Sequence, residues 1–505
     1  MPSRRTFLKS LAALGALPNN LFADQSPSPS QLANDPLRPQ FHLLPARNWM
    51  NDPDGPIYFN GHYHMFFQYN PNAAVWGDMH WAHAISPDML HWQHLPVALA
   101  PTPGGPDADG CFSGSAILHN GIPTFLYTGV RSVSPSEATL RDGRHNFLET
   151  QCLATSRDPD LRTWQKHPTP VLLPPRDPKL TGFRDPCLWQ EKNLWYMGIG
   201  SGQRGARGQV FLYRSADLLT WEYLNPLARG ESASGDHPDP VDAGDMWECP
   251  DFFPINGKHV LLYSTRRKVF WEVGEYDAKE HRFHSQKRGL LDHGAFYAPK
   301  SQLDAQGHRI LWGWIPETRP EAEFFAAGWA GCMSLPRVLA VNKDNELTQR
   351  VIDEVFTLGL VENSWILNSS LNDMQRTSIR QLALDGTACA LQVVFGKKPF
   401  RLSLADGNSS IVQVAYDPGS TGRELQLNSS TAPLPPRPTN DHHLTLFFDA
   451  SVLECFADDT LALTTRLYHV PNSPLRLSAT DADLAALHSL SISPIKPISP
   501  DRLAT

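Results

Sequence analysis

Residues 55–69 read GPIYFNGHYHMFFQY, in which two runs of β-forming residues flank the dipeptide Asn60–Gly61. Asn-Gly between two such runs is the strongest short-range signal for a β-hairpin, because both residues readily adopt the positive φ angles of a tight turn. We therefore predict two antiparallel strands joined by a two-residue turn.

Four further stretches have the same form, with a lead-in of polar or small residues, an apolar run, a turn and a second apolar run. They are GSAILHNGIPTFLYTG (114–129), PCLWQEKNLWYMGIGS (186–201), PDFFPINGKHVLLYST (250–265) and PKSQLDAQGHRILWGW (299–314). Three shorter stretches share Ser, Asp and Trp, follow a hairpin and are interpreted as connectors into a later strand: SPDMLHW (86–92), SRDPDLRTW (156–164) and SADLLTW (215–221). Units of roughly 50 to 70 residues with about four strands each are typical of β-propeller blades.

The predicted fold class is all-β, with a five-bladed β-propeller at residues 38–345 followed by a β-sandwich at residues 363–500. One long sandwich is the alternative, but it predicts no such regular restart. Alternating runs with frequent turn signals, such as residues 444–459, indicate the sandwich. Residues 346–362 are interpreted as a connector, in which ELTQRVIDEVFTLG (346–359) predicts a short helix.

The first 23 residues resemble a twin-arginine signal peptide. Arg4 and Arg5 precede Phe7-Leu8-Lys9 and a short apolar stretch, which Pro18 interrupts before it reaches the length needed to span a bilayer. Residues 24–37 would be a linker. No later segment approaches 18 consecutive apolar residues, so we expect a soluble protein that is exported to the periplasm or beyond, without a membrane partner.

Composition argues against several other classes of protein. The net charge of −8 comes from 52 acidic and 44 basic residues without a basic stripe, so a nucleic-acid partner is not expected. The seven cysteines are widely spread without zinc-site spacing and are interpreted as buried free thiols. There are two His-x-x-His pairs, at residues 80–83 and 91–94. On a strand, the two histidines of each pair would point to opposite faces, which argues against a shared metal ion. A calcium ion at PDADG (106–110) is less favoured than a polar loop, and neither a metal nor a cofactor is predicted.

Three carboxylates lie at the starts of predicted hairpins in three different blades. They are Asp52 in WMNDPDG (49–55), Asp185 in FRDP (183–186) and Glu248 in WECPD (247–251). The first strand of each blade lines the central channel, so these side chains should converge at one mouth. Like charges placed together destabilise a fold, which favours a functional reason for their placement. The structural alternatives are an ion pair between Arg184 and Asp185 and a Glu248 that only accepts backbone amides.

Glycoside cleavage requires such a set, because one carboxylate must stay ionised while another donates a proton to the leaving oxygen. Asn51 and the turn amides beside Asp52 favour its anion, and Arg184 should favour an ionised Asp185. Glu248 follows Met246 and Trp247 and lies near Asp251, surroundings that favour a protonated general acid.

Residues 38–340 resemble glycoside hydrolase family 32, the invertase, inulinase and levanase family. The motifs that carry the resemblance are WMNDPDG, FFQYNPNAAVWGDMHWAHA, FSGSA, FRDP, WECPD, ILWGW and GWAGCMSLPR. The tail FFDASVLECFADD (447–459) is similar to the β-sandwich module of that family. The resemblance implies a five-bladed propeller followed by a sandwich, as the hairpins also predict.

The resemblance implies that Asp52 is the nucleophile, Glu248 the acid/base and Asp185 a transition-state stabiliser that binds fructose hydroxyls. It implies that fructose is held by Asn51, Gln68, Trp76, Phe112, Ser113 and Arg184, with Trp49 and Trp314 lining the pocket. The implied reaction is retaining hydrolysis of terminal β-fructofuranosides, in sucrose or in fructans such as inulin and levan.

Two departures from the family pattern stand out. Asp54 replaces the Asn common in the first motif and adds a charge near Asp52. The stretch YSTRRKVFWEV (263–273) is shorter than its counterpart in plant invertases, which weakens an expectation of strict sucrose specificity.

Three other functions fit parts of the sequence. A fructosyltransferase would use another sugar instead of water and differs only in its acceptor site. A non-catalytic carbohydrate-binding propeller has no need of three carboxylates. A five-bladed arabinoside or xyloside hydrolase uses a similar acid set, but the NDPDG and ECPD contexts favour fructosides.

Overall fold

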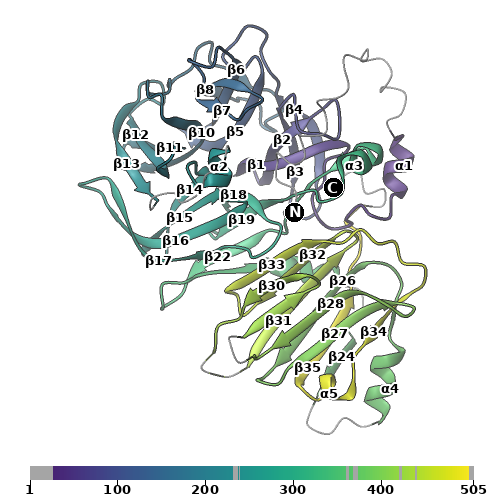
Figure 1. Ribbon diagram of the computed structural model, residues 1–505. Coiled ribbons are helices and arrows are strands. Elements are labelled where there is room, and N and C mark those ends of the chain that lie inside the picture. Colours follow the sequence, from purple (N-terminus) through teal and green to yellow (C-terminus); the bar gives the residue numbers. More distant parts are fainter. Residues whose placement is uncertain are drawn as a thin grey trace. The chain divides into compact units, whose positions relative to one another are not determined.

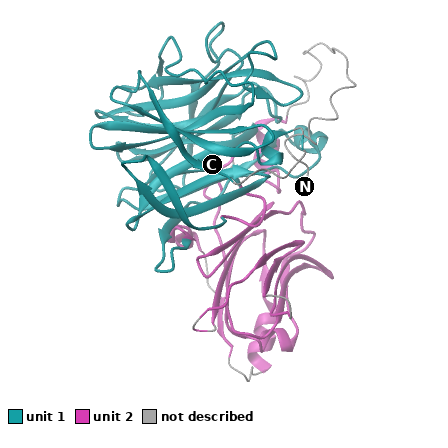
Figure 2. Ribbon diagram, turned by 60° about the vertical axis from the view of Figure 1, so that its left-hand side comes forward, with its two compact units in different colours: residues 1–26, 45–290, 297–347 teal, residues 27–44, 291–296, 348–505 magenta. Residues whose placement is uncertain are grey.

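The computed structural model describes residues 27–230, 237, 239–359, 363–367, 373–419, 423–437, 439 and 441–499, so the predicted signal peptide lies outside the described residues. These residues form two compact units (Figure 2). The first comprises residues 45–290 and 297–347, and the second contains residues 27–44, 291–296 and the chain from Thr348 onward. Residues 38–44 and 291–296, inside the predicted propeller range, thus belong to the second unit.

The five predicted hairpins are confirmed as the first two strands of five sheets. Where the turn is Asn-Gly, both residues have positive φ, for example 50° at Asn60 and 81° at Gly61. The strands on either side of this turn pair from Phe59 and His62 onward, which leaves a two-residue loop. The Asn-Gly signal therefore fixes the strand register as well as the turn.

The Ser-Asp-Trp stretches are confirmed as connectors between strands, and their shared residues make the same hydrogen bonds. In residues 215–221, the Ser215 Oγ accepts from the Asp217 backbone N at 3.2 Å, and the Trp221 indole N donates to the Leu218 carbonyl at 3.0 Å. The same pair of bonds recurs in residues 86–92 and in residues 156–164. The repeated sequence encodes a repeated turn.

Within the described residues, the first unit contains five sheets, which are the five blades of the predicted propeller (Figure 1). The first blade contains β1 (Asn48–Phe59), β2 (His62–Asn70), β3 (His80–Ser86), β4 (Gln93–Leu99) and β20 (Trp329–Ala330). The second contains β5 (Gly110–His119), β6 (Ile122–Ser132), β7 (Leu140–Arg141), β8 (Asn146–Thr155) and β9 (Gln165–Lys166). The third contains β10 (Leu180–Glu191), β11 (Leu194–Gln203), β12 (Arg207–Ser215) and β13 (Glu222–Arg229). The fourth contains β14 (Glu248–Ile255), β15 (Lys258–Thr265), β16 (Lys268–Asp277) and β17 (Arg282–Leu290). The fifth contains β18 (Tyr297–Leu303), β19 (Arg309–Ile315), β21 (Cys332–Met333), β22 (Arg337–Val341) and β23 (Leu347–Val351), and the residues of β23 after Leu347 belong to the second unit. The helices α2 (Pro240–Ala243) and α3 (Glu321–Ala327) lie in loops.

The first strands of the five blades form a closed ring, since β1, β5, β10, β14 and β18 each contact the next and β18 contacts β1. Strand β20, which lies between β19 and β21 of the fifth blade in the sequence, pairs in parallel with the start of β1 and so joins the fifth blade to the first. Aromatic side chains fill the space between neighbouring blades, as where Phe125 stacks on Trp164 and packs against Phe66.

The second unit contains the predicted β-sandwich, with two sheets of six strands each within the described residues. One sheet has the order β24 (Asn363–Ile366), β35 (Leu487–Pro494), β26 (Ala388–Phe395), β31 (His442–Asp449), β32 (Val452–Ala457) and β33 (Leu461–Arg466). The other has the order β25 (Ala383–Leu384), β34 (Leu475–Ser478), β27 (Phe400–Asp406), β28 (Ser409–Asp417), β29 (Glu424–Leu427) and β30 (Ser430–Pro433). The α-helices of the second unit, within the described residues, are α1 (Pro29–Asn34), α4 (Asp373–Gln381) and α5 (Asp481–Leu484). Alternate side chains of both sheets form one apolar core.

The short helix predicted at residues 346–359 is wrong in its first half. Leu347–Val351 is strand β23, which completes the fifth blade, and only Asp353–Leu358 is helical, as a 3-10 turn. Leu347, Gln349 and Val351 are buried while the residues between them are not. This period of two is the pattern of a strand.

His42 fastens the N-terminal segment of the second unit to the β31–β32 hairpin. Its ring nitrogens lie 2.7 Å from the Asp449 carboxylate and 3.0 Å from that of Glu454. Asp449 also accepts the backbone N–H groups of Gln40, Phe41 and His42. Burial alone would lower the pKa of His42, but the hydrogen bonds and charges of the two carboxylates outweigh it and raise this pKa to about 9.

The raised pKa predicts that this contact stabilises the protein fully below pH 6.5 and that the stabilisation is lost as pH rises through about 9. The quantity of interest is the free energy of unfolding of the wild type minus that of His42→Gln. We expect this difference to be larger at pH 6.5 than at pH 9.5 by on the order of 3 kcal/mol. Denaturant titrations of both proteins at the two pH values measure this difference. A difference that does not change with pH would contradict the prediction.

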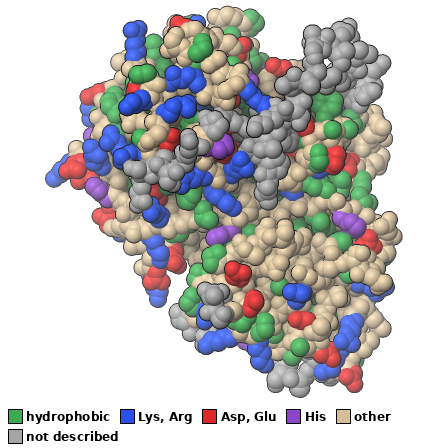
Figure 3. All heavy atoms as spheres, viewed as in Figure 1, with side chains coloured by type: hydrophobic (Ala, Val, Ile, Leu, Met, Phe, Trp, Pro, Cys, Tyr) green, Lys and Arg blue, Asp and Glu red, His purple; other side chains and the backbone are tan. Residues whose placement is uncertain are grey.

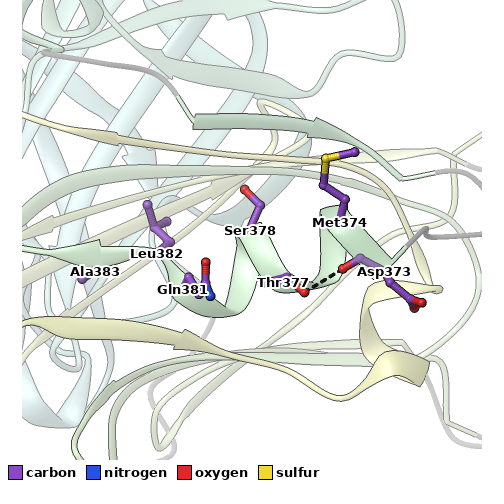
Figure 4. A pocket seen from close by; sticks show the side chains of 7 residues that line it. All are labelled: Asp373, Met374, Thr377, Ser378, Gln381, Leu382 and Ala383. Carbon is purple, nitrogen blue, oxygen red and sulfur yellow. Dashed lines mark hydrogen bonds between the residues drawn. The ribbon is translucent and has the colours of Figure 1, made fainter.

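All seven cysteines are buried and free. Among the described residues, no helix combines the length and apolar character that crossing a bilayer requires. On the face drawn in Figure 3, basic and acidic side chains are interspersed. A pocket of about 660 Å³ lies along α4 in the second unit, where Met374 and Leu382 line it (Figure 4), and none of the predicted site residues belongs to it.

Candidate active site

The predicted catalytic residues lie on the first strands of their blades, at or next to shifts in the strand register. Asp52 falls in the shift between Met50 and Pro53 of β1, and Asp185 falls in the shift between Arg184 and Cys187 of β10. Similar shifts occur in β5, in β14 directly after Glu248, and in β18 directly after Tyr297. Bulges of this kind redirect side chains, and here at least one occurs in every first strand.

Asp52 is buried and its carboxylate is held by three donors. The Ser113 hydroxyl donates to Oδ2 at 2.8 Å, the Asn51 amide donates to Oδ1 at 3.0 Å, and the Cys249 thiol lies 3.4 Å from Oδ2. These donors come from β1, β5 and β14. The site therefore holds this carboxylate in one orientation through hydrogen-bond donors.

Asp185 and Asp52 share a neighbour, because Cys249 contacts both carboxylates. The backbone N and the thiol of Cys249 lie 2.9 Å and 3.5 Å from Asp185 Oδ2, and the same thiol contacts Asp52. The backbone at Asp185 has a φ of 62°, a strained conformation for a residue other than glycine, and its N–H donates to Thr128 Oγ1 at 3.0 Å. Strain of this kind is frequent where a structure holds a functional side chain in place.

Arg184 favours the ionised form of Asp185, as expected from the sequence, but burial has a larger and opposite effect on the pKa of Asp185. Burial raises the pKa of Asp185 to about 7, with smaller contributions from the charges of Glu248 and Asp52, although Arg184 acts in the opposite direction. The Arg184 Nε lies 3.9 Å from the carboxylate, too far for a hydrogen bond. The pKa of Asp185 therefore lies near neutral pH, because burial outweighs the charge of Arg184.

Glu248 is held at both oxygens. Arg184 donates to Oε1 from Nη2 at 2.9 Å and from Nε at 3.3 Å, and the Tyr297 hydroxyl donates to Oε2 at 2.7 Å. Asp251, which the sequence placed near Glu248, instead accepts from the backbone N and the hydroxyl of Ser301 at 2.9 and 2.5 Å. The immediate contacts of Glu248 are thus polar rather than the apolar neighbours expected from WECPD.

Arg184 links Glu248 to a further buried carboxylate, Glu149 of β8. Arg184 Nη1 donates to Glu149 Oε1 at 2.8 Å. Glu149 Oε2 accepts from the Thr139 hydroxyl at 2.8 Å and from the Phe183 backbone N at 2.7 Å. The guanidinium therefore lies between two carboxylates and its position is fixed by both.

The other predicted sugar-binding residues form two groups around the carboxylates. Trp49 donates its indole N–H to Asn51 Oδ1 at 2.7 Å, and its ring centre lies 5.8 Å from that of Trp314. The ring of Trp76 packs edge-on against Phe112 at 5.9 Å. Trp76 is only half-buried, as suits a ring that a ligand would cover.

Gln68 is fixed by its amide group. Its Nε2 donates to Asp54 Oδ2 and to the Cys111 carbonyl, each at 2.8 Å. Both amide protons are used, so Oε1 is the group that Gln68 can offer to a sugar hydroxyl.

Three residues of the site were not predicted from the sequence: Cys249 and Tyr297, which contact the carboxylates, and Glu149, which holds Arg184. Cys249 and Tyr297 had a signal, because each stands at the start of a predicted hairpin, in WECPD and in FYAPKS (296–301). Glu149 had a weaker one, as a single charge in the otherwise buried strand NFLETQCLAT (146–155).

Among the described residues, the side chains that come close enough together to hold an ion are Asp277, Glu280 and His284, where β16 turns into β17. They are largely exposed and are not the carboxylates of the candidate site. Acid–base chemistry by carboxyl groups is what the convergent residues can perform.

Comparisons with known proteins identify the family of the chain. The family model for the glycosyl hydrolases family 32 N-terminal domain matches residues 42–351, and the model for the family 32 C-terminal region matches residues 364–494. A sucrose-6-phosphate hydrolase of Escherichia coli is 35% identical over 470 residues, which cover 86% of this chain and 90% of the relative. A raffinose invertase of Escherichia coli is 41% identical over 340 residues, 63% of this chain and 66% of the relative.

Solved structures show the same fold. Fructan 1-exohydrolase IIa from Cichorium intybus has a TM-score of 0.77 and 27% identity, with coverage of 92% of this chain and 98% of the relative. A family 32 β-fructofuranosidase from Bombyx mori has a TM-score of 0.72 and 26% identity, with coverage of 95% and 97%.

Proposed function

The chain belongs to glycosyl hydrolase family 32 and is a hydrolase of the β-fructofuranosidase type, and we propose that it is exported and removes terminal β-D-fructofuranosyl residues from sucrose, fructans or both. One observation supports the proposal most directly. The Cys249 thiol contacts both Asp52 and Asp185, and Cys249 directly follows Glu248. Three carboxylates from three blades therefore meet at one place, within reach of one sugar ring.

We assign the roles from the contacts of each carboxylate. Asp52, oriented by Ser113 and Asn51, attacks the anomeric carbon of the fructosyl unit and forms a covalent fructosyl ester. Glu248 gives its proton to the oxygen of the departing sugar, so that the glycosidic bond breaks without leaving an alkoxide. In the second step Glu248 takes a proton from water, which attacks the ester and releases fructose.

Asp185 and the groups around Glu248 support these two residues. Asp185 accepts hydrogen bonds from fructose hydroxyls, which become more acidic as positive charge develops on the ring, so the bonds strengthen in the transition state. Arg184 and Tyr297 donate hydrogen bonds to Glu248 and hold it in place through the steps in which it loses and regains its proton. A fixed acid/base reacts without a reorganisation cost.

A substrate panel tests the function. We expect the purified mature protein to release fructose from sucrose, and the panel should include inulin, levan, raffinose and sucrose 6-phosphate, since relatives are named for acting on several of these classes. Fructose and total oligosaccharide are measured by chromatography at low and high sucrose. Oligosaccharides in place of free fructose would point to transfer instead of hydrolysis, and no product from any member would refute the proposal.

Export rests on the N-terminal motif with Arg4 and Arg5. We propose that the mature protein works in the periplasm or outside the cell. Fractionation of cells that make the full chain and an Arg4→Lys, Arg5→Lys variant tests this, because loss of the paired arginines should retain the protein in the cytoplasm. Equal cytoplasmic retention of both proteins would refute it.

A further inference from the structure

Asp54 is the least satisfied carboxyl group near the candidate active site. It lies in β1 two residues after Asp52 and its exposed fraction is 0%. Its Oδ2 accepts one hydrogen bond, from Gln68 Nε2 at 2.8 Å. Its Oδ1 is buried and has no hydrogen-bond partner among the described residues.

Two other buried carboxyl groups of the described residues, Asp449 and Asp292, are surrounded by donors. Asp449 accepts from three backbone N–H groups and from the ring of His42. Asp292 accepts from the backbone N of Gly294 and from the backbone N and hydroxyl of Thr464. A buried carboxylate without such donors costs several kcal/mol. A single neutral amide does not meet the needs of a charged Asp54.

Burial and the neighbouring carboxylates both favour the protonated form of Asp54. Burial raises the pKa of Asp54 well above its usual range, and the negative charge of Asp52 and, more weakly, that of Asp185 raise it further. The hydrogen bond from Gln68 and the charge of Lys300 lower it without compensating. The Lys300 ammonium donates to the Pro250 carbonyl at 3.1 Å and not to Asp54.

We propose that Asp54 is an uncharged carboxylic acid in the working enzyme and acts as a positioning residue that holds Gln68. Its carbonyl oxygen accepts the hydrogen bond from Gln68 Nε2, as the side-chain oxygen of an asparagine would. Gln68 is thereby left with Oε1 for a substrate hydroxyl. The neutral acid adds no second negative charge beside the carboxylate that attacks the fructosyl unit, so that like-charge repulsion within the site is avoided. This last consequence rests on the proposed function, whereas the protonation itself does not.

The primary test is the pH dependence of stability in Asp54→Asn, which keeps the shape and the acceptor oxygen but cannot ionise. Above pH 3.8 the unfolded wild type loses the Asp54 proton while the folded protein keeps it, so the wild type loses stability as pH rises toward the folded pKa. The variant has no such loss. We expect the melting temperature of Asp54→Asn minus that of the wild type to increase by about 3 °C or more between pH 4.5 and pH 8.

Asp107→Asn is the matched control, since Asp107 is also a buried aspartate of the first unit. Burial alone would raise the pKa of Asp107, but its contact with Lys166 outweighs burial and lowers this pKa. The melting temperature of Asp107→Asn minus that of the wild type should therefore fall, not rise, as pH increases from the acid range. The opposite signs separate protonation of Asp54 from a general effect of replacing buried aspartates.

Two further readouts complete the experiment. The infrared difference spectrum of wild type minus Asp54→Asn at pH 7 should contain the C=O stretch of a protonated carboxyl group. In kcat/KM profiles, the alkaline limb of Asp54→Asn should extend to higher pH than that of the wild type. If no substrate is turned over, the proposed function fails while stability and infrared data still decide on Asp54. A pH-independent stability difference together with a carboxylate band would overturn the proposal.

Discussion

Replacing Asp52 with Asn is expected to leave the protein folded and to lower kcat on its fructoside substrate by about 10⁴-fold or more. The amide has the shape of the carboxylate and can still accept from Ser113 at one oxygen. It cannot form the fructosyl ester, so both halves of the double displacement are lost. Initial rates at saturating substrate, together with circular dichroism and a melting curve, give the result.

Ser113→Ala is the matched control, because it removes the 2.8 Å hydrogen bond to Asp52 Oδ2 but keeps the carboxylate. We expect a loss of roughly 10- to 100-fold, as is typical for one hydrogen bond to a charged group. Asp52→Asn within tenfold of the wild type, in a preparation shown by mass spectrometry to be free of deamidated protein, would rule out Asp52 as the nucleophile.

The propeller could be predicted from sequence because its information is local and repeated. Each Asn-Gly turn fixes a strand register by itself, and each Ser-Asp-Trp connector encodes its own hydrogen bonds, so that errors in one blade do not spread. One of the missed parts depends on a partner far along the chain, because residues 38–44 join the second unit through Asp449, some 400 residues later. The other, strand β23, pairs with β22 only a few residues before it, and the sequence of residues 346–359 favoured a helix over that pairing.

The candidate site divides in the same way. Its carboxylates were found because they stand at equivalent positions of the repeat, where topology alone brings them together. Their environments could not be found from neighbours in sequence. Asp251 is three residues from Glu248 yet turns to Ser301, whereas Glu149 and Tyr297, which are remote in sequence, reach Arg184 and Glu248. Bulges in the first strands decide which side chains face the channel, and no local sequence signal announces them.

Replacing Glu248 with Gln should produce a loss that depends on the leaving group. On sucrose, whose glucosyl leaving group needs protonation, we expect kcat/KM to fall by about 10³-fold. On a fructoside with an activated aryl or fluoride leaving group, which departs without a proton, the first step should be slowed far less. The fructosyl ester on Asp52 then accumulates, because water is no longer deprotonated.

Azide separates the acid/base role of Glu248 from a merely structural one. As a nucleophile that needs no general base, it should attack the accumulated ester, increase turnover of the activated substrate and yield fructosyl azide, which mass spectrometry identifies. Tyr297→Phe provides the control, since it removes the hydrogen bond to Glu248 Oε2 at 2.7 Å but leaves the carboxyl group. That variant should shift the pH profile of kcat/KM and show no azide rescue. An equal loss on all leaving groups without rescue would mean that Glu248 shapes the site and moves no proton.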